Sequence, residues 1–159
     1  MIVIIYFDDF YKDLVRRIDK KYKLVHFTQI PKTLVPDTLI ITGSKKRILR
    51  EPAYRDLDDI IHRTKRLVIG ICYGFQYLAR LDGGIIEENP TAFRGLKNGH
   101  HYNHFDKVTS LPKEWNVVER ERDFISVAYA PHTTNHWIGF QFHPEKKQSD
   151  YEKYIGSII

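Results

Sequence analysis

The sequence feature that most constrains the fold is a strand-to-helix turn around the single cysteine, within the apolar stretch 67–75. Residues 66–71 predict a buried strand, and residues 74–81 predict a helix that begins almost at once. Gly70 and Gly74 flank Cys72 two residues away on either side. A chain that turns from strand to helix within one residue brings these flanking positions together, so glycine fits there best. The pattern therefore predicts that Cys72 is presented at the carboxyl edge of a sheet.

The order of the other apolar segments indicates an α/β fold. In the first half, strands are expected at residues 2–7, 24–28, 38–42 and 66–71, with helices at residues 10–20, from Pro52 onward and at residues 74–81. This alternation indicates a mostly parallel sheet with helices on its faces. In the second half, strands are expected at residues 100–109, 116–119, 124–129 and 137–143, followed by a helix over residues 150–159. Because no repeat or linker interrupts the chain, residues 1–159 are predicted to form a single α/β domain with added antiparallel strands.

Composition and charge exclude several classes of protein. Hydrophobic residues make up 42% of the 159 residues and charged residues 28%, which is typical of soluble globular proteins. No apolar stretch is long enough to span a membrane, and the N-terminus lacks the basic leader of a signal peptide. A single cysteine cannot form an intrachain disulfide, which favours a cytoplasmic location. The net charge of +5 is spread over short runs of Lys and Arg, so we expect no nucleic-acid site.

The position of Cys72 favours a nucleophile over a buried, inert thiol. The amides at the N-terminus of the following helix point toward the sulfur and favour the thiolate. The backbone amide of Tyr73 is then placed to bind an oxyanion. A lone cysteine is most often inert, but its place between a predicted strand and a predicted helix favours the catalytic interpretation.

A second motif supplies the groups that a cysteine nucleophile needs. The run 141–145, Gln-Phe-His-Pro-Glu, ends a predicted strand. Alternate residues of an extended chain face the same way, so we expect His143 and Glu145 to point to one side. A histidine can take and return the thiol proton, while a carboxylate fixes its tautomer. The sequence thus predicts a triad of Cys72, His143 and Glu145.

The two motifs resemble the signatures of class I glutamine amidotransferases, most closely those of the glutaminase part of GMP synthetases. Residues 11–18 are similar to the first helix of that family, residues 39–44 to its oxyanion strand, and residues 104–112 to its His-Gly-Asp-x-Val-x-x-Leu-Pro segment. The resemblance implies a flavodoxin-like fold, with a mostly parallel central sheet, helices on both faces and added antiparallel strands.

The resemblance also implies a reaction and a role for each site residue. Cys72 is expected to attack the side-chain amide of L-glutamine, and His143 to act as base and then as acid, oriented by Glu145. Water then hydrolyses the γ-glutamyl thioester, with no cofactor. The amides of Gly43 and Tyr73 are expected to form the oxyanion hole. Substrate binding is expected at Gln76, Asn103, His104 and Phe105.

Three departures from the family pattern bear on the site. Gly43-Ser44-Lys45 stands where the family usually has Gly-Gly-Pro, so the loop is expected to bend differently. Phe105 stands where the family often has glycine, and since phenylalanine rarely adopts a positive φ, we expect a narrowed or reshaped pocket. The interval between Cys72 and His143 is also short for the family, as though a segment after Gly84 were trimmed. Residues 92–95 stand as a remnant of the Arg-Glu-Tyr-Gly-like stretch that the family has there.

Several other functions remain open at this point. No synthetase-like segment follows the histidine motif in this sequence, so the ammonia is expected to reach a separate synthetase subunit, such as a GMP synthetase. A stand-alone γ-glutamyl hydrolase or peptidase could use the same triad, whereas a non-catalytic subunit would be expected to lack one of its members. A metal site at His100, His101 and His104, with His132 and His136 nearby, is disfavoured because adjacent strand residues face opposite sides.

Overall fold

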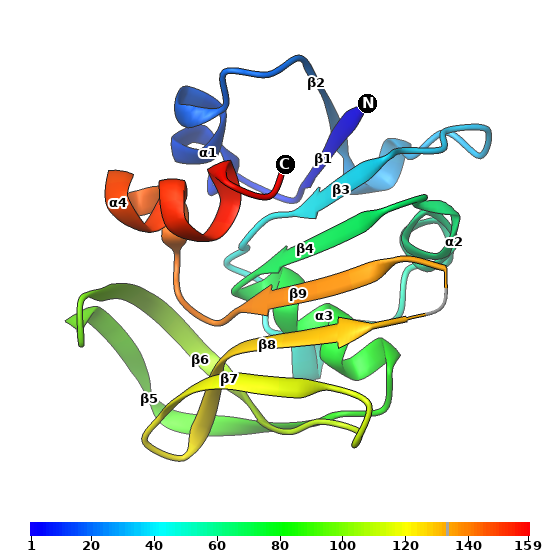
Figure 1. Ribbon diagram of the computed structural model, residues 1–159. Helices are drawn as coiled ribbons and strands as arrows, with labels where there is room; N and C mark the ends of the chain where they lie inside the picture. Colours follow the sequence, from blue (N-terminus) through cyan, green and yellow to red (C-terminus); the bar gives the residue numbers. More distant parts are fainter. Residues whose placement is uncertain (133) are drawn as a thin grey trace.

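The computed structural model describes residues 1–132 and 134–159, and a seven-stranded sheet forms its centre (Figure 1). The strand order is β2-β1-β3-β4-β9-β8-β7. Strands β2, β1, β3, β4 and β9 run parallel, and β8 and β7 add an antiparallel edge. The strands are β1 (Ile2–Tyr6), β2 (Tyr22–His26), β3 (Thr38–Ile41), β4 (Leu67–Ile71), β7 (Asn116–Glu121), β8 (Phe124–Pro131) and β9 (His136–Phe140). The 2-1-3-4 order of the first strands is flavodoxin-like, and the predicted fold class is confirmed.

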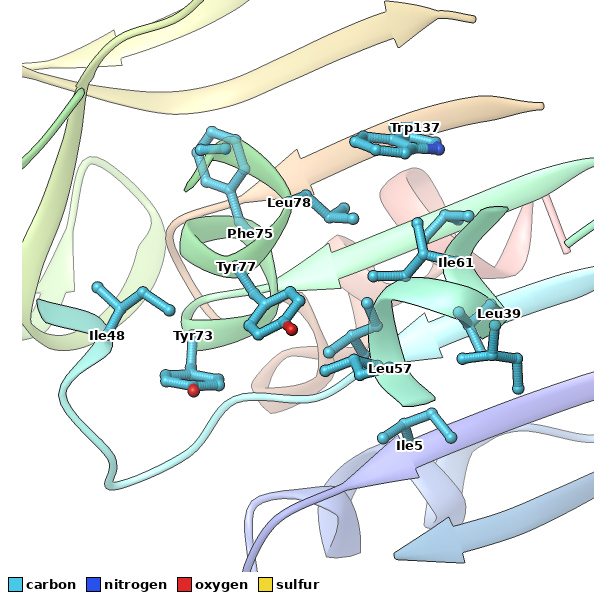
Figure 2. Close-up of a cluster of buried hydrophobic side chains, with 14 of the residues drawn as sticks. Ile5, Leu39, Ile48, Leu57, Ile61, Tyr73, Phe75, Tyr77, Leu78 and Trp137 are labelled. Carbon is cyan, nitrogen blue, oxygen red and sulfur yellow. The ribbon is translucent and has the colours of Figure 1, made fainter. Parts of the chain in front are cut away.

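Helices cover both faces of the sheet, which explains why the central strands read as continuous apolar runs. Helices α2 (Arg55–Arg63) and α3 (Tyr73–Leu81) pack on one face. The other face is covered by α1 (Tyr11–Arg17) and by α4 (Gln148–Tyr151), which continues as a π-helix, Glu152–Gly156. Figure 2 shows the first of these two cores, where Leu57 of α2 and Phe75 of α3 lie among Ile5, Leu39 and Trp137 of the strands. No helix in the described part of the chain is long and apolar enough to cross a membrane.

A separate two-stranded hairpin lies beside the carboxyl edge of the sheet, at the lower left of Figure 1. It consists of β5 (Ile85–Lys97) and β6 (His100–Ser110), which pair antiparallel. Its turn residues, Asn98 and Gly99, both have positive φ, 48° and 83°, as a type I′ turn requires. The sequence predicted β6 but not β5. The hairpin matters because β6 forms one wall of the candidate site.

Several predicted boundaries are wrong. The helix predicted over residues 10–20 is Tyr11–Arg17, and the strand predicted over residues 24–28 is Tyr22–His26. The helix after Pro52 begins at Arg55, because Tyr54 is still extended. The C-terminal helix begins at Gln148, two residues before the predicted start. The strand predicted over residues 137–143 ends at Phe140. Gln141 N–H still bonds to the carbonyl of Ser126 on β8, but His143 N–H bonds to the carbonyl of His101 on β6. Short 3-10 turns occupy Phe27–Gln29, Ile48–Arg50 and Pro144–Lys146.

Candidate active site

Cys72 occupies a strained turn between β4 and α3. Its φ of 51° and ψ of −102° lie outside the regions that non-glycine residues commonly adopt. Such strain persists only where the surrounding structure enforces it, and it concentrates at functional sites. Here the Cys72 amide donates to the carbonyl of Phe140 on the neighbouring strand, at 2.6 Å. The predicted strand-to-helix turn is confirmed.

The two flanking glycines are required by close backbone contacts. A Cβ added to Gly70 would lie 2.6 Å from the backbone carbonyl of Gly74, and one added to Gly74 would lie 2.2 Å from the carbonyl oxygen of Ile41. No side chain fits at these distances. The glycines therefore allow α3 to start directly above β3 and β4, with Cys72 at its first turn.

The Cys72 sulfur is almost fully buried and meets polar groups from two other elements. Its Sγ lies 3.6 Å from the carbonyl oxygen of Asn103 on β6, and the Gln141 side-chain amide donates to it at 3.8 Å. Gln141 follows β9 and belongs to the 141–145 motif. That motif therefore supplies both the histidine and a hydrogen-bond donor to the Cys72 sulfur. Sequence reasoning missed this contact, although Gln141 is the first residue of the motif.

His143 and Glu145 form a buried pair. His143 Nδ1 donates to Glu145 Oε1 at 2.7 Å, and both side chains are at most 2% exposed. The backbone is not extended as predicted, because Pro144–Lys146 forms a 3-10 turn. Arg17 of α1 holds this turn by donating to the backbone carbonyls of Glu145 and Lys146. The two side chains therefore meet, but through a turn and not through the alternation of a strand.

The electrostatics of this pair favour a charged imidazole. Burial by itself lowers the pKa of His143, but the Glu145 carboxylate and the Cys72 sulfur outweigh it and raise the pKa to about 10. His143 Nε2 is buried and, among the described residues, has no hydrogen-bond partner. The ring thus has one nitrogen fixed by the carboxylate and the other available for proton transfer.

The two predicted oxyanion donors follow adjacent strands. Gly43 comes after β3, and a Cβ at this position would lie 2.7 Å from His143 Cε1, so the loop passes directly against the imidazole. Tyr73 is the first residue of α3, and the amides of a first helical turn have no partner within the helix. Both amides therefore lie at the same edge of the sheet as Cys72.

A cavity of about 120 Å³ opens beside Cys72. Six of the residues singled out from the sequence line it: Cys72, Tyr73, Gln76, Asn103, His104 and Phe105. Gly43, His143 and Glu145 lie outside its lining, although Gly43 and His143 lie against each other. The rest of the wall comes from Phe10, Asp106, Arg94 and residues 44–47.

The side chains of two predicted substrate-binding residues form hydrogen bonds to the backbone of the protein. Gln76 is buried, and its side-chain amide donates to the backbone carbonyl of Asp106 at 2.7 Å. His104 Nδ1 donates to the same carbonyl at 2.9 Å, and its Nε2 is buried without a partner in the part of the chain described. Burial lowers the pKa of His104 to about 4, so this imidazole is neutral at pH 7. Its Nε2 therefore presents a lone pair and accepts hydrogen bonds.

Phe105 has the backbone conformation expected of a residue other than glycine. It lies within β6, and its φ is not positive, so no glycine is needed there. Its half-buried ring lines the cavity and makes cation–π contacts with the guanidinium groups of Arg47 and Arg94. The central carbons of these groups lie 4.5 Å and 5.7 Å from the ring centre. The ring is thus part of the cavity wall.

Asp106 is a connecting residue that sequence reasoning missed. Its buried carboxylate accepts from Arg47 at 2.6 Å and 3.1 Å, while its carbonyl accepts from Gln76 and His104. It therefore joins the loop after Gly43 to α3 and to β6. The signal was available, because Asp106 lies within the 104–112 segment that matched the family pattern.

The histidines considered as metal ligands are separated. His100 stacks on Phe142 at 3.9 Å and contacts Asp150 and Glu119, whereas His104 faces the cavity. Within residues 1–132 and 134–159, no group of three or more His, Cys, Asp or Glu side chains is arranged to hold a metal ion.

Known proteins are similar in sequence to this chain over most of its length. The model of the family "Glutamine amidotransferase class-I" matches residues 6–156. The chain is 28% identical to a glutamine-hydrolysing GMP synthase of Bacteroides fragilis over 156 residues, which cover 86% of the chain and 30% of the relative. It is 29% identical to the Bacillus licheniformis enzyme of the same name over 175 residues, covering 95% and 34%. The chain thus spans about a third of the length of these curated relatives.

Solved structures share the fold. A protein designated as a GMP synthase subunit from Thermoplasma acidophilum superposes with a TM-score of 0.78 at 18% identity, covering 98% of this chain and 92% of that one. A glutamine amidotransferase from Thermotoga maritima gives a TM-score of 0.69 at 14% identity, covering 98% and 80%.

Proposed function

The chain belongs to the class I glutamine amidotransferases, and we propose that it hydrolyses L-glutamine to L-glutamate and ammonia with Cys72 as the nucleophile. The observation that carries this proposal is the strained, positive-φ Cys72 at the start of α3, beside a buried histidine that Glu145 fixes at 2.7 Å. The Nε2 of that histidine has no partner among the described residues, so it is available to move a proton. A buried inert cysteine needs neither a strained backbone nor a neighbouring histidine–carboxylate pair.

The first half of the reaction makes a thioester. The Cys72 thiolate attacks the side-chain amide carbon of glutamine, and the carbonyl electron pair moves to oxygen, where the Gly43 and Tyr73 amides stabilise it. His143, charged because its pKa lies at about 10, gives its Nε2 proton to the amide nitrogen. The C–N bond then breaks, ammonia leaves, and the carbonyl re-forms as a γ-glutamyl thioester.

The second half returns the enzyme to its starting state. Neutral His143 takes a proton from water, whose oxygen attacks the thioester carbon. The C–S bond breaks, which releases glutamate and restores the thiolate beside the imidazolium. Glu145 holds Nδ1 throughout, so the same ring nitrogen, Nε2, handles every proton.

Glu145→Gln is expected to lower kcat by about 10²-fold, at the low end of what general acid–base catalysis contributes, because an amide oxygen still orients the ring. Without the carboxylate, the pKa of His143 falls, so the imidazolium needed to release ammonia is lost at lower pH. The alkaline limb of the pH profile of kcat should therefore move to lower pH. Glu152→Gln, an exposed residue of the C-terminal helix, is the matched control. An unmoved alkaline limb in Glu145→Gln would contradict the role of Glu145.

The substrate is expected to lie in the cavity beside Cys72, where Gln76, Asn103, His104 and Phe105 contribute to the wall. We propose that His104 Nε2, a neutral acceptor, receives an N–H of glutamine, and that the Asn103 carbonyl near the sulfur does the same. Gln76 supports this wall through its bond to Asp106.

We further propose that the ammonia passes to a synthetase of the GMP synthase kind, since the curated relatives carry that activity in their names. The test is release of ammonia from L-glutamine and from γ-glutamyl dipeptides, with and without a GMP synthetase. We expect a preference for glutamine and a weak rate alone, well below about 10 s⁻¹, that rises with the synthetase. A faster reaction with dipeptides would favour a stand-alone γ-glutamyl hydrolase, and no turnover with either substrate would favour a non-catalytic subunit.

A further inference from the structure

A carboxylate just past the end of β1 holds the loop that follows Gly43. Asp8 Oδ2 accepts hydrogen bonds from the Ser44 hydroxyl at 2.9 Å and from the Lys45 amide at 2.8 Å. The Ser44 hydroxyl oxygen in turn accepts from the Lys46 amide at 3.0 Å. Because β1 and β3 are neighbouring parallel strands, the residues that follow each of them meet at one edge of the sheet.

The second oxygen of Asp8 reaches the histidine side of the same site. Asp8 Oδ1 accepts from the Phe10 amide at 3.2 Å. The Phe10 ring stacks on the imidazole of His143, with 5.3 Å between the ring centres. The same ring lies against Gly43, since its Cδ1 would be 3.5 Å from a Cβ at that position. Both segments that enclose Gly43 are therefore bound to one carboxylate.

We propose that Asp8, acting through Ser44 and Lys45, is a positioning residue that fixes the Gly43 amide as an oxyanion donor. The inference rests on the proposed acyl transfer at Cys72. Lys45 stands where the family resemblance places a proline, whose ring would fix φ. Lys45 has no such restriction, so the conformation of this loop depends on its contacts. Asp8 supplies two of them, within two residues of Gly43.

The consequence for chemistry is specific to reactions that form an oxyanion. A donor must lie about 2.7–3.1 Å from the developing charge, and loss of one donor costs about 10²–10³-fold in rate. Acylation of Cys72 by p-nitrophenyl acetate passes through a tetrahedral oxyanion and expels p-nitrophenolate. Alkylation by iodoacetamide forms an S–C bond and expels iodide without an oxyanion. The ratio of the two rates therefore separates a loss of oxyanion stabilisation from a loss of Cys72 thiolate reactivity.

The experiment compares Asp8→Asn, Ser44→Ala and the double variant with Asp9→Asn as the matched control. The asparagine side chain in Asp8→Asn keeps an oxygen for the Phe10 amide but places an NH₂ group opposite the Lys45 amide. The stacking of the Phe10 ring on His143 is therefore preserved. Asp9 is the exposed neighbour, whose carboxylate pairs only with Lys12 among the described residues. Each variant is assayed for acylation by p-nitrophenyl acetate, alkylation by iodoacetamide and kcat for glutamine.

We expect Asp8→Asn to lower acylation and kcat by about 10-fold or more, as a partial loss of one donor. Alkylation and the Asp9→Asn rates should stay within about twofold of the wild type. The double variant should lose at least as much as Asp8→Asn, because Ser44→Ala also removes the hydrogen bond from the Lys46 amide. Unchanged acylation in Asp8→Asn, or an equal fall in acylation and alkylation, would overturn the proposal. If wild-type protein fails to hydrolyse glutamine but its acylation depends on Asp8, then the proposed function fails and this inference stands.

Discussion

Replacing Cys72 with alanine is expected to abolish glutamine turnover, with a loss of about 10⁶-fold, as for removal of a nucleophile that works as part of a triad. Without the sulfur no thioester can form, and water bound in the cavity has no comparable activation. The fold should survive, because alanine is smaller than cysteine and the backbone turn is enforced by the contacts of Gly70 and Gly74. The measurements are ammonia release, labelling by a glutamine-like electrophile and thermal unfolding.

His143→Ala should cost nearly as much, and the double variant with Cys72→Ala should lose nothing further, since the two residues act as a unit. Cys72→Ser serves as the matched control for packing, because it keeps the shape of the side chain while replacing the reactive atom. Turnover by Cys72→Ala above about 1% of the wild-type rate would rule out the thioester mechanism.

The nucleophile and its histidine–carboxylate pair could be predicted because each lies in a short run of contiguous residues, 70–74 and 141–145. The spacing Gly70, Cys72 and Gly74 encodes the turn, and the structure supplies its cause: a Cβ added to Gly74 would lie 2.2 Å from the Ile41 carbonyl oxygen. His143 and Glu145 were expected to meet, but for the wrong reason. A strand and a 3-10 turn can both place two side chains that are two residues apart on the same side. Hydrophobic periodicity alone does not distinguish the two conformations.

Strand β5 could not be predicted from hydrophobic pattern. Most of its residues are exposed on both sides, so it lacks the alternation that marks a half-buried strand. Turn chemistry carried the missing signal. Asn98-Gly99, just before the predicted strand that begins at His100, is a strong hairpin dipeptide and implies a partner strand on its other side.

Asp8 was missed because its role depends on topology. It lies 36 residues from Ser44 in the sequence, and nothing local to either residue predicts their contact. Once β1 and β3 are known to be adjacent and parallel, both residues fall at the carboxyl edge beside Cys72. The contact of Asp106 with Arg47 also depends on topology, because β6 folds back beside the sheet, although the 104–112 family segment already contained Asp106.

Gly74→Ala is expected to destabilise the protein by about 3 kcal/mol or more, at the upper end of what overpacking costs. The added Cβ would lie 2.2 Å from the Ile41 carbonyl oxygen, an atom of the central strand β3 that cannot move aside as a flexible side chain can. The gain in helix propensity, about 1 kcal/mol, is too small to offset this clash.

The matched control for Gly74→Ala is Gly156→Ala in the C-terminal helix. There the nearest atom to an added Cβ is Cε1 of the Tyr151 ring at 3.2 Å, which can shift slightly. The free energy of unfolding from urea titration should fall sharply in the first variant and change by less than about 1 kcal/mol in the second. Because α3 must move to relieve the clash, the Tyr73 amide moves with it, and any folded Gly74→Ala protein should also lose glutamine turnover. A Gly74→Ala protein as stable and active as the wild type would show that the turn at Cys72 does not require the approach of α3 to β3.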